Sequence, residues 1–207
     1  MSLEQEIKLK VMQADALDLS ALTWLSALLE SKPYKQHLLS TYFDTPDKAL
    51  MQFGVGLRLR QVDQKWLQTV KSSGEAVDGL HQRQEWEHEV AGSEFNETLL
   101  KQTALAPLLE NKTVWDAVAP VFTTDFERLV MPLILEDGTQ IEMAYDRGRV
   151  IAGGKQQNIH EIELELKRGD IKKCQQLAET LKAALALEYS DVSKAAQGYG
   201  LSQVIEK

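Results

Sequence analysis

Three glutamates alternate with apolar residues over positions 161–167, whose sequence is EIELELK. A spacing of two is typical of a β-strand with one polar and one apolar face, whereas a helix would scatter Glu161, Glu163 and Glu165 around its surface. On a strand the three carboxylates would lie in one row, about 7 Å apart. They would repel one another, so we expect positive charge on the same face. A half-buried antiparallel strand whose acids face water is the simpler interpretation, and recurrence of the pattern elsewhere argues against it.

Further segments repeat the alternation with charged side chains on one face, among them residues 3–12 (LEQEIKLKVM) and 54–62 (GVGLRLRQV). The acidic candidates are Glu4, Glu6, Glu161, Glu163 and Glu165, followed by Glu85 and Asp146. The basic candidates are Lys8, Arg58, Arg60, Lys71, Arg83, Arg128 and Lys194. Carboxylates from two strands offer the all-oxygen ligands that Mg²⁺ or Mn²⁺ prefers, and forked arginine donors match phosphate oxygens. A metal–polyphosphate complex would satisfy both sets. Direct ion pairs between the sets are the alternative, and they would stabilise the fold little.

The ordered set of motifs resembles the CYTH superfamily, the triphosphate tunnel metalloenzymes. Residues 4–8 (EQEIK) are similar to the Glu-x-Glu-x-Lys signature of that family. The resemblance continues through residues 57–60 (LRLR), 69–71 (TVK), 81–85 (HQRQE), 124–128 (TDFER), Asp146, 161–167 and 193–196 (SKAA). Any amphipathic strand can show Glu-x-Glu-x-Lys, so the specificity lies in the whole series. The segments at 81–85 and 193–196 resemble in particular the bacterial inorganic triphosphatases, which often carry a helical CHAD domain after the CYTH domain. We expect such a domain to be absent or to lie outside residues 1–207.

The resemblance implies a role for each candidate residue. Metal ligands would be Glu4, Glu6, Glu163 and Glu165, assisted by Glu161 and Asp146. The triphosphate would be bound by Lys8, Arg58, Arg60, Lys71, Arg83, Arg128 and Lys194. The residues acting in the reaction would be Glu4, Glu6, Lys8, Arg58, Arg60, Lys71, Glu85, Arg128, Asp146 and Lys194, with Glu85 orienting a basic neighbour. One metal would bind the phosphates, and a second could polarise the attacking water.

The function favoured by this pattern is metal-dependent hydrolysis of a small triphosphate, first of all inorganic triphosphate, to pyrophosphate and phosphate. The alternatives are an adenylyl cyclase of the class IV type, a thiamine triphosphatase and a non-catalytic polyphosphate-binding module. No aromatic set can be assigned to a thiamine ring. Gly153-Gly154-Lys155 lacks the spacing of a P-loop, and the four histidines lack zinc-site spacing.

The charged rows require a sheet that encloses them. Strands are predicted at 3–12, 35–44, 54–62, 66–71, 80–90, 119–135, 140–146, 147–152 and through 161–167, and the segment 74–79 is predicted to be a loop. Helices are predicted from Asp18 or Ser20 to about Glu30, over 94–116 with a break at Pro107, from about Asp170 to Leu187, and from about Ser190 to Ile205. We expect an α+β fold in which eight antiparallel strands form a barrel, or tunnel, with a charged interior. The helices would cover its apolar outer face, and residues 1–207 would form a single CYTH domain.

Composition agrees with a globular enzyme. The chain has 207 residues, 43% of them hydrophobic and 26% charged, and a formal net charge of −8. This charge argues against nucleic acid as a partner, so a basic site must be local and enclosed. No apolar run is long enough for a membrane span and no signal peptide is recognisable, and the single Cys174 fits a buried structural thiol. We therefore expect a cytoplasmic protein without a membrane partner, and the sequence leaves its oligomeric state open.

Overall fold

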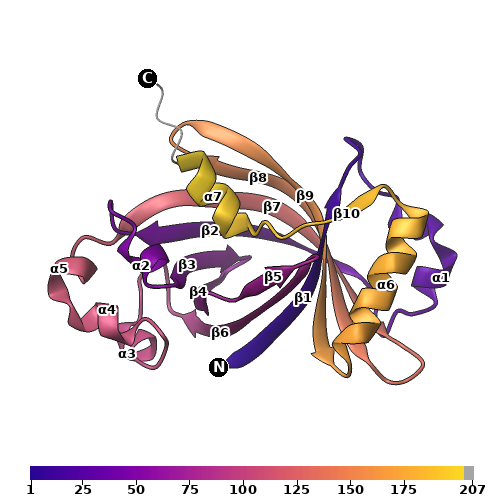
Figure 1. The fold of residues 1–207 in the computed structure, drawn as a ribbon, viewed down its shortest axis with the longest axis horizontal. Coiled ribbons are helices and arrows are strands. Elements are labelled where there is room, and N and C mark those ends of the chain that lie inside the picture. Colours follow the sequence, from indigo (N-terminus) through magenta and orange to yellow (C-terminus); the bar gives the residue numbers. More distant parts are fainter. Residues whose placement is uncertain (203–207) are drawn as a thin grey trace.

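Eight strands of the chain close into an antiparallel barrel (Figure 1). They are β1 (Ser2–Val11), β2 (Tyr34–Asp44), β3 (Val55–Val62), β4 (Lys65–Ser72), β6 (Leu80–Val90), β7 (Ala119–Ile134), β8 (Gln140–Ala152) and β9 (Lys155–Arg168). The computed structural model describes residues 1–202. Neighbouring strands run in the order β1-β9-β8-β7-β2-β3-β4-β6, and β6 pairs with β1 to close the sheet. The predicted eight-stranded barrel is confirmed.

Two short strands extend the barrel wall. The strand β5 (Glu75–Val77) pairs with β6, and β10 (Leu187–Tyr189) pairs with the end of β1. The prediction of a plain loop over 74–79 was therefore wrong, as was the division of 140–152 into two strands, because β8 continues without interruption opposite β9.

The chain between β1 and β2 contains less helix than predicted. A 3-10 turn, η1 (Leu19–Ala21), follows the cap at Asp18, and α1 (Thr23–Ser26) ends well before Glu30. The backbone beyond α1 turns extended instead, since Leu29 forms a bridge with Leu133 and the Glu30 amide donates to the Pro132 carbonyl. Pairing with the end of β7 thus ends the helix.

The segment 94–116 also differs from its prediction, because it forms three short helices. These are α3 (Glu97–Leu100), α4 (Ala106–Glu110) and α5 (Lys112–Trp115). The side chains of Asn96 and Asn111 each cap a new helix, which explains the interruptions. Pro107 does not break a helix but lies in the first turn of α4, where its missing N–H costs nothing.

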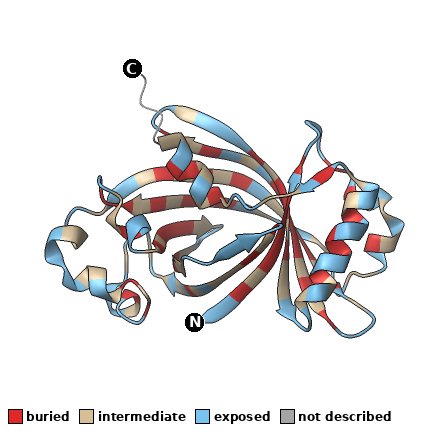
Figure 2. Ribbon diagram, viewed as in Figure 1, coloured by how far each residue is buried: buried red, intermediate tan, exposed pale blue. Residues whose placement is uncertain are grey.

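Two apolar regions of the outer face are covered by these elements, whereas the outward side chains Glu127, Arg147 and Arg149 on β7 and β8 are polar and exposed (Figure 2). On one side Ile7, Leu9 and Ile162 pack against the helix α6 (Ile171–Ala184), where Cys174 is fully buried as expected. On the other side the segment α3–α5 and α2 (Ala49–Gln52) cover β3, β4 and β6. Each fully buried Leu or Ile contributes about 1.5–3 kcal/mol, so the outward residues stabilise the barrel while the inward ones remain free for chemistry.

The last helix, α7 (Lys194–Ser202), does not follow the prediction that helices cover only the outer face. It packs against Phe122, Val150 and Ile159, which share the inward face of their strands with the charged rows. These contacts lie at the end of the barrel where β7 and β9 begin and β8 ends, so α7 covers that end (Figure 1). The predicted end of this helix, Ile205, lies outside the described residues.

Close packing fixes the position of α7. Gly198 lies against the ring of Phe122, where an added Cβ would be 2.2 Å from a ring carbon. The hydroxyl of Tyr199 donates to the buried carboxylate of Asp44 at 2.7 Å. Across residues 1–202, the helices are too short or too polar to cross a membrane.

Candidate active site

A cavity of about 1030 Å³ occupies the interior of the barrel. The predicted site residues that line it are Glu4, Glu6, Lys8, Arg58, Arg60, Lys71, Arg83, Glu85, Arg128, Glu163, Glu165 and Lys194. The other two, Asp146 and Glu161, are buried beside the basic residues of this lining. The sequence-based prediction that these side chains share one enclosed space therefore holds for their positions.

Six of these residues form what we call the central cluster. Its members are Lys8, Arg128, Asp146, Glu161, Glu163 and Lys194. Strand register brings them together, because Lys8 pairs with Glu163, Glu161 with Asp146, and Asp146 with Arg128 across neighbouring strands. The sixth, Lys194, reaches the cluster from α7. The cluster thus joins β1, β7, β8 and β9 to the helix that covers the end of the barrel.

Short ion pairs connect the members of the central cluster. Arg128 donates to both oxygens of Asp146 at 2.7 Å and to Glu163 at 2.5 Å. Lys194 Nζ lies 2.7 Å from Asp146 and 2.8 Å from Glu163, and it also bonds to Glu161. Lys8 Nζ, on a side chain that is 1% exposed, contacts Glu161 at 3.0 Å and also bonds to Glu163. Three cations therefore neutralise three carboxylates in the centre of the tunnel.

These contacts determine the charge states of the central cluster. Burial by itself would raise the pKa of Glu163, but Lys194, Lys8 and Arg128 hold that pKa well below its usual value. Burial would likewise lower the pKa of Lys8, yet the carboxylates of Glu161 and Glu163 raise it well above its usual value. Lys8 and Glu163 are therefore both charged at neutral pH.

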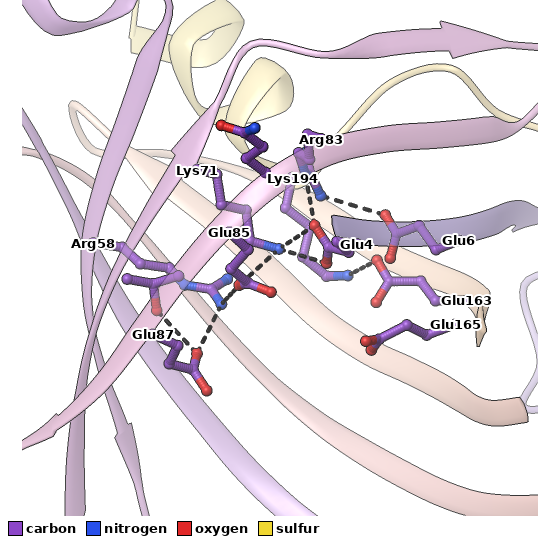
Figure 3. Close-up of polar contacts among 12 residues, drawn as sticks. Glu4, Glu6, Arg58, Lys71, Arg83, Glu85, Glu87, Glu163, Glu165 and Lys194 are labelled. Atoms are coloured by element: carbon purple, nitrogen blue, oxygen red, sulfur yellow. Dashed lines mark hydrogen bonds and ion pairs between the residues drawn. The ribbon is translucent and has the colours of Figure 1, made fainter. Parts of the chain in front are cut away.

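A second group of ion pairs surrounds Glu4 (Figure 3). Its carboxylate accepts from Lys71 Nζ at 2.6 Å and from Arg83 Nε at 2.7 Å, and Arg83 also lies 3.4 Å from Glu6. Burial raises the pKa of Glu4, but the two cations outweigh burial and lower it to about 2. Lys71 is held in turn by Glu85 at 3.1 Å, which fits the predicted orienting role of that residue.

Among the residues that the structure describes, two arginines of β3 have longer ion pairs or none. Arg58 lies 3.7 Å from Glu85 and 3.6 Å from Glu87, and its buried Nε has no hydrogen-bond partner in residues 1–202. Arg60 donates from Nε to the Ser40 hydroxyl at 2.9 Å. Within the described chain Arg60 is the one predicted phosphate ligand without a carboxylate at ion-pair distance. Burial, and after it the Arg58 charge, lower the pKa of Arg60 to about 10. An anion in the cavity would relieve both arginines.

Sequence reasoning missed two residues beside these arginines. Glu87 lines the cavity, accepts from the Thr69 hydroxyl at 3.0 Å and faces Arg58. Its spacing of two from Glu85 was a usable signal. Tyr42 also lines the cavity, with its hydroxyl 3.5 Å from Arg58, but the residues on its side of β2, Ser40 and Asp44, do not form the charged row that would have indicated it.

Glu165 lies apart from the central cluster. Its carboxylate pairs with Lys167 at 2.8 Å, and Lys167 also lies 3.7 Å from Glu142. Burial, with smaller contributions from Glu4 and Glu142, raises the pKa of Glu165. Glu165 is therefore a carboxylate of the cavity that a metal ion could bind without first displacing a residue of the central cluster.

The donor set fits a hard divalent cation. Carboxylate oxygens of Asp146, Glu161 and Glu163 lie within 4.8 Å of one another. Glu4 and Glu6 face the same cavity, and the carboxylates supply oxygen ligands alone. The direct ion pairs that the sequence left open as an alternative are also present. Binding of a metal–phosphate complex would therefore be an exchange of partners, in which cations move from carboxylates to phosphate oxygens.

The chain is similar to known proteins in sequence and in fold. The CYTH domain family matches residues 2–199. An inorganic triphosphatase from Haemophilus influenzae is 34% identical over 195 residues, which cover 94% of this chain and 54% of that protein. The chain thus spans about half the length of this relative.

Two solved structures share the fold. A Hippeastrum protein, described as a candidate adenylyl cyclase with a dominant triphosphatase activity, matches with a TM-score of 0.68 and 21% identity, covering 97% of both chains. The triphosphatase of the mimivirus capping enzyme matches with a TM-score of 0.53 and 14% identity, covering 87% of this chain and 88% of the other. At these identities the likeness establishes the fold.

Proposed function

This chain belongs to the CYTH domain family, and we propose that it is a divalent-metal-dependent triphosphatase that hydrolyses inorganic triphosphate to pyrophosphate and phosphate. The observation that carries the proposal is one cavity in which basic residues from β1, β3, β4, β6, β7 and α7 converge on carboxylates from β1 and β9. The match over residues 2–199 supports treating the chain as a single CYTH domain. The 34% identity to an inorganic triphosphatase supports the choice of substrate.

The carboxylates would hold the metal. Its ligands would be Glu4, Glu6, Glu163 and Glu165, assisted by Glu161 and Asp146, with Mg²⁺ or Mn²⁺ as the ion. When bound, such an ion neutralises phosphate charge and lowers the pKa of a coordinated water. The arrangement makes this exchange feasible, because the basic partners of these carboxylates are themselves candidate phosphate ligands, except for Lys167 beside Glu165.

The basic residues would bind and orient the phosphate chain. Within residues 1–202, Arg60 has no carboxylate at ion-pair distance and Arg58 has longer contacts to Glu85 and Glu87, so both offer guanidinium donors for phosphate. Arg83 and Lys71 would transfer hydrogen bonds from Glu4 to phosphate oxygens, and Glu85 would keep Lys71 aimed at the cavity. Because the barrel wall encloses them, these charges would stabilise the developing charge of the transferred phosphoryl group more strongly than in bulk solution.

The test is release of phosphate from inorganic triphosphate in the presence of Mg²⁺ or Mn²⁺. We expect turnover by the wild-type protein and at least a hundredfold loss in Glu6→Gln, which removes one metal-binding carboxylate but keeps its size. Equal rates for the two proteins would exclude the proposal. Parallel assays with ATP and thiamine triphosphate define the substrate, and formation of cyclic AMP from ATP would indicate a cyclase. A cytoplasmic location and a CHAD domain outside these residues stay predictions.

A further inference from the structure

Three basic residues of the tunnel surround one aromatic ring, that of Phe126 on β7. The distances to the ring centroid are 5.9 Å for Arg60 Cζ, 5.7 Å for Arg128 Cζ and 5.0 Å for Lys194 Nζ. All three fall within the range in which the electron-rich face of an aromatic ring attracts a cation. Phe126 belongs to the motif at 124–128, of which the proposed function uses only Arg128.

The three cations come from three separate elements and repel one another. Arg60 extends from β3, Arg128 from β7 and Lys194 from α7. Arg128 and Lys194 are neutralised by carboxylates of the central cluster, whereas within residues 1–202 Arg60 has only the Ser40 hydroxyl as a hydrogen-bond acceptor. The quadrupole of the ring is therefore an attractive contact that all three share.

The two neighbouring strands pack closely against Phe126. Phe126 is 1% exposed and pairs with Leu38 on β2 and with Gly148 on β8. A Cβ at position 148 would lie 2.4 Å from the Phe126 Cβ and 2.2 Å from the Asp125 carbonyl oxygen. A side chain at position 148 would collide with the backbone and Cβ of Phe126, so glycine at this position permits the ring to lie where it contacts the three cations.

From this arrangement we propose that Phe126 is a positioning residue for triphosphate binding, which holds Arg60, Arg128 and Lys194 together at the cavity wall. The ring does not line the cavity, so it acts through the three cations and not by touching substrate. The inference rests on the proposed function for the identity of the ligand. Weakening the negative face of the ring should loosen the cations and lower the affinity for triphosphate.

Fluorinated phenylalanines test this proposal with little change in side-chain volume. Four proteins are compared, which carry phenylalanine, 4-fluorophenylalanine, 3,5-difluorophenylalanine or 3,4,5-trifluorophenylalanine at position 126. Each added fluorine withdraws electron density from the face of the ring. The dissociation constant of inorganic triphosphate is measured by calorimetry in EDTA, so that the result does not depend on turnover. We expect a stepwise loss of affinity that reaches about tenfold with three fluorines. With Mg²⁺, KM should rise in parallel while kcat changes little.

Phe122 provides the matched control. It lies on the same face of β7, is 3% exposed, and contacts the rings of Tyr42 and Tyr199 with no basic side chain over its face in the described residues. The same fluorinated series at position 122 should leave the affinity unchanged. The proposal would be overturned if the dissociation constant did not change with the number of fluorines at position 126, or if it changed equally at positions 126 and 122.

The two proposals can fail separately. If the wild-type protein binds triphosphate in EDTA but releases no phosphate with any divalent metal, the proposed function is wrong while the slope at position 126 still decides the role of the ring. If the wild-type protein does not bind triphosphate, both are overturned.

Discussion

Replacement of Arg60 by methionine should strengthen the fold and weaken triphosphate binding at the same time. Arg60 is buried, faces Arg58 and Arg128, and has no carboxylate at ion-pair distance in residues 1–202. Its pKa, lowered to about 10 first by burial and then by Arg58, measures how unfavourable the charge is in the folded protein. At about 1.4 kcal/mol for each pKa unit, the charge costs the fold about 3 kcal/mol.

Methionine removes this cost and fills a similar volume. The variant loses the hydrogen bond from Arg60 to Ser40, worth about 1.5 kcal/mol, so a net gain of about 1–2 kcal/mol remains. For a chain of this length the midpoint of thermal unfolding should rise by about 3–6 °C. Loss of charged hydrogen bonds to phosphate, at about 1.5–3 kcal/mol, should weaken triphosphate binding by about 10- to 100-fold.

Arg83→Met is the comparison that separates this reasoning from a general effect of removing charge. Arg83 pairs with Glu4 and Glu6, and its loss would leave buried Glu4 with Lys71 and buried Glu6 with Lys8 at 3.8 Å, so breaking these pairs should cost about 3–5 kcal/mol. Thermal unfolding in EDTA, followed by circular dichroism, should therefore shift in opposite directions for the two variants. Both should bind triphosphate more weakly in calorimetry. A destabilised Arg60→Met, or one with wild-type affinity, would refute the argument.

Three further outcomes follow from the geometry. In EDTA, the unfolding free energy of the wild-type protein should fall more steeply between pH 5 and pH 3 than that of Glu4→Gln. The reason is that the folded protein lowers the pKa of Glu4 to about 2, so the ionised carboxylate stabilises the fold above the unfolded pKa and this stabilisation is lost as the pH falls. Urea titrations at each pH measure the unfolding free energy, and parallel curves for the two proteins would contradict the prediction. Gly198→Ala should displace α7 from Phe122 and reduce turnover at least tenfold, whereas Gly200→Ala, where an added Cβ meets nothing within 4 Å, should leave turnover intact in the same phosphate assay. Chelation of divalent metals should abolish turnover yet leave circular dichroism and thermal unfolding nearly unchanged, since the carboxylates already have basic partners; unfolding on chelation would show that metal is part of the fold.

The barrel and its charged interior were predictable because a strand has only two faces. Once Arg58 and Arg60 are assigned to a strand with Leu57 and Leu59 between them, the arginines must share one side, and a packed core cannot accept them. The same argument placed Glu161, Glu163 and Arg83 in the tunnel, where the structure has them. The alternation of charged and apolar residues along each strand was sufficient to predict which side chains face the interior.

Which basic residue would pair with which carboxylate was not predictable, because these ion pairs depend on the register between strands that are distant in sequence. Nothing near Lys8 in sequence indicates that it will pair with Glu163, 155 positions later. The position of α7 inside the barrel end was missed for a related reason, since a short amphipathic helix can pack on either face of a sheet. The contacts that decide it, Gly198 on Phe122 and Tyr199 on Asp44, are long-range.

The balance of charge inside the tunnel has a consequence for how the substrate arrives. Each acidic row carries its own countercharges, so the interior projects little field toward the solvent, while the molecule as a whole has a formal net charge of −8. A polyanion without bound cations is repelled by the net negative charge of the protein, and no positive field steers it toward the cavity. A polyanion that travels with bound cations meets far less repulsion and brings the ions that the displaced carboxylates require. The charge-balanced interior of the tunnel therefore favours a polyphosphate whose charge is already largely neutralised by bound cations.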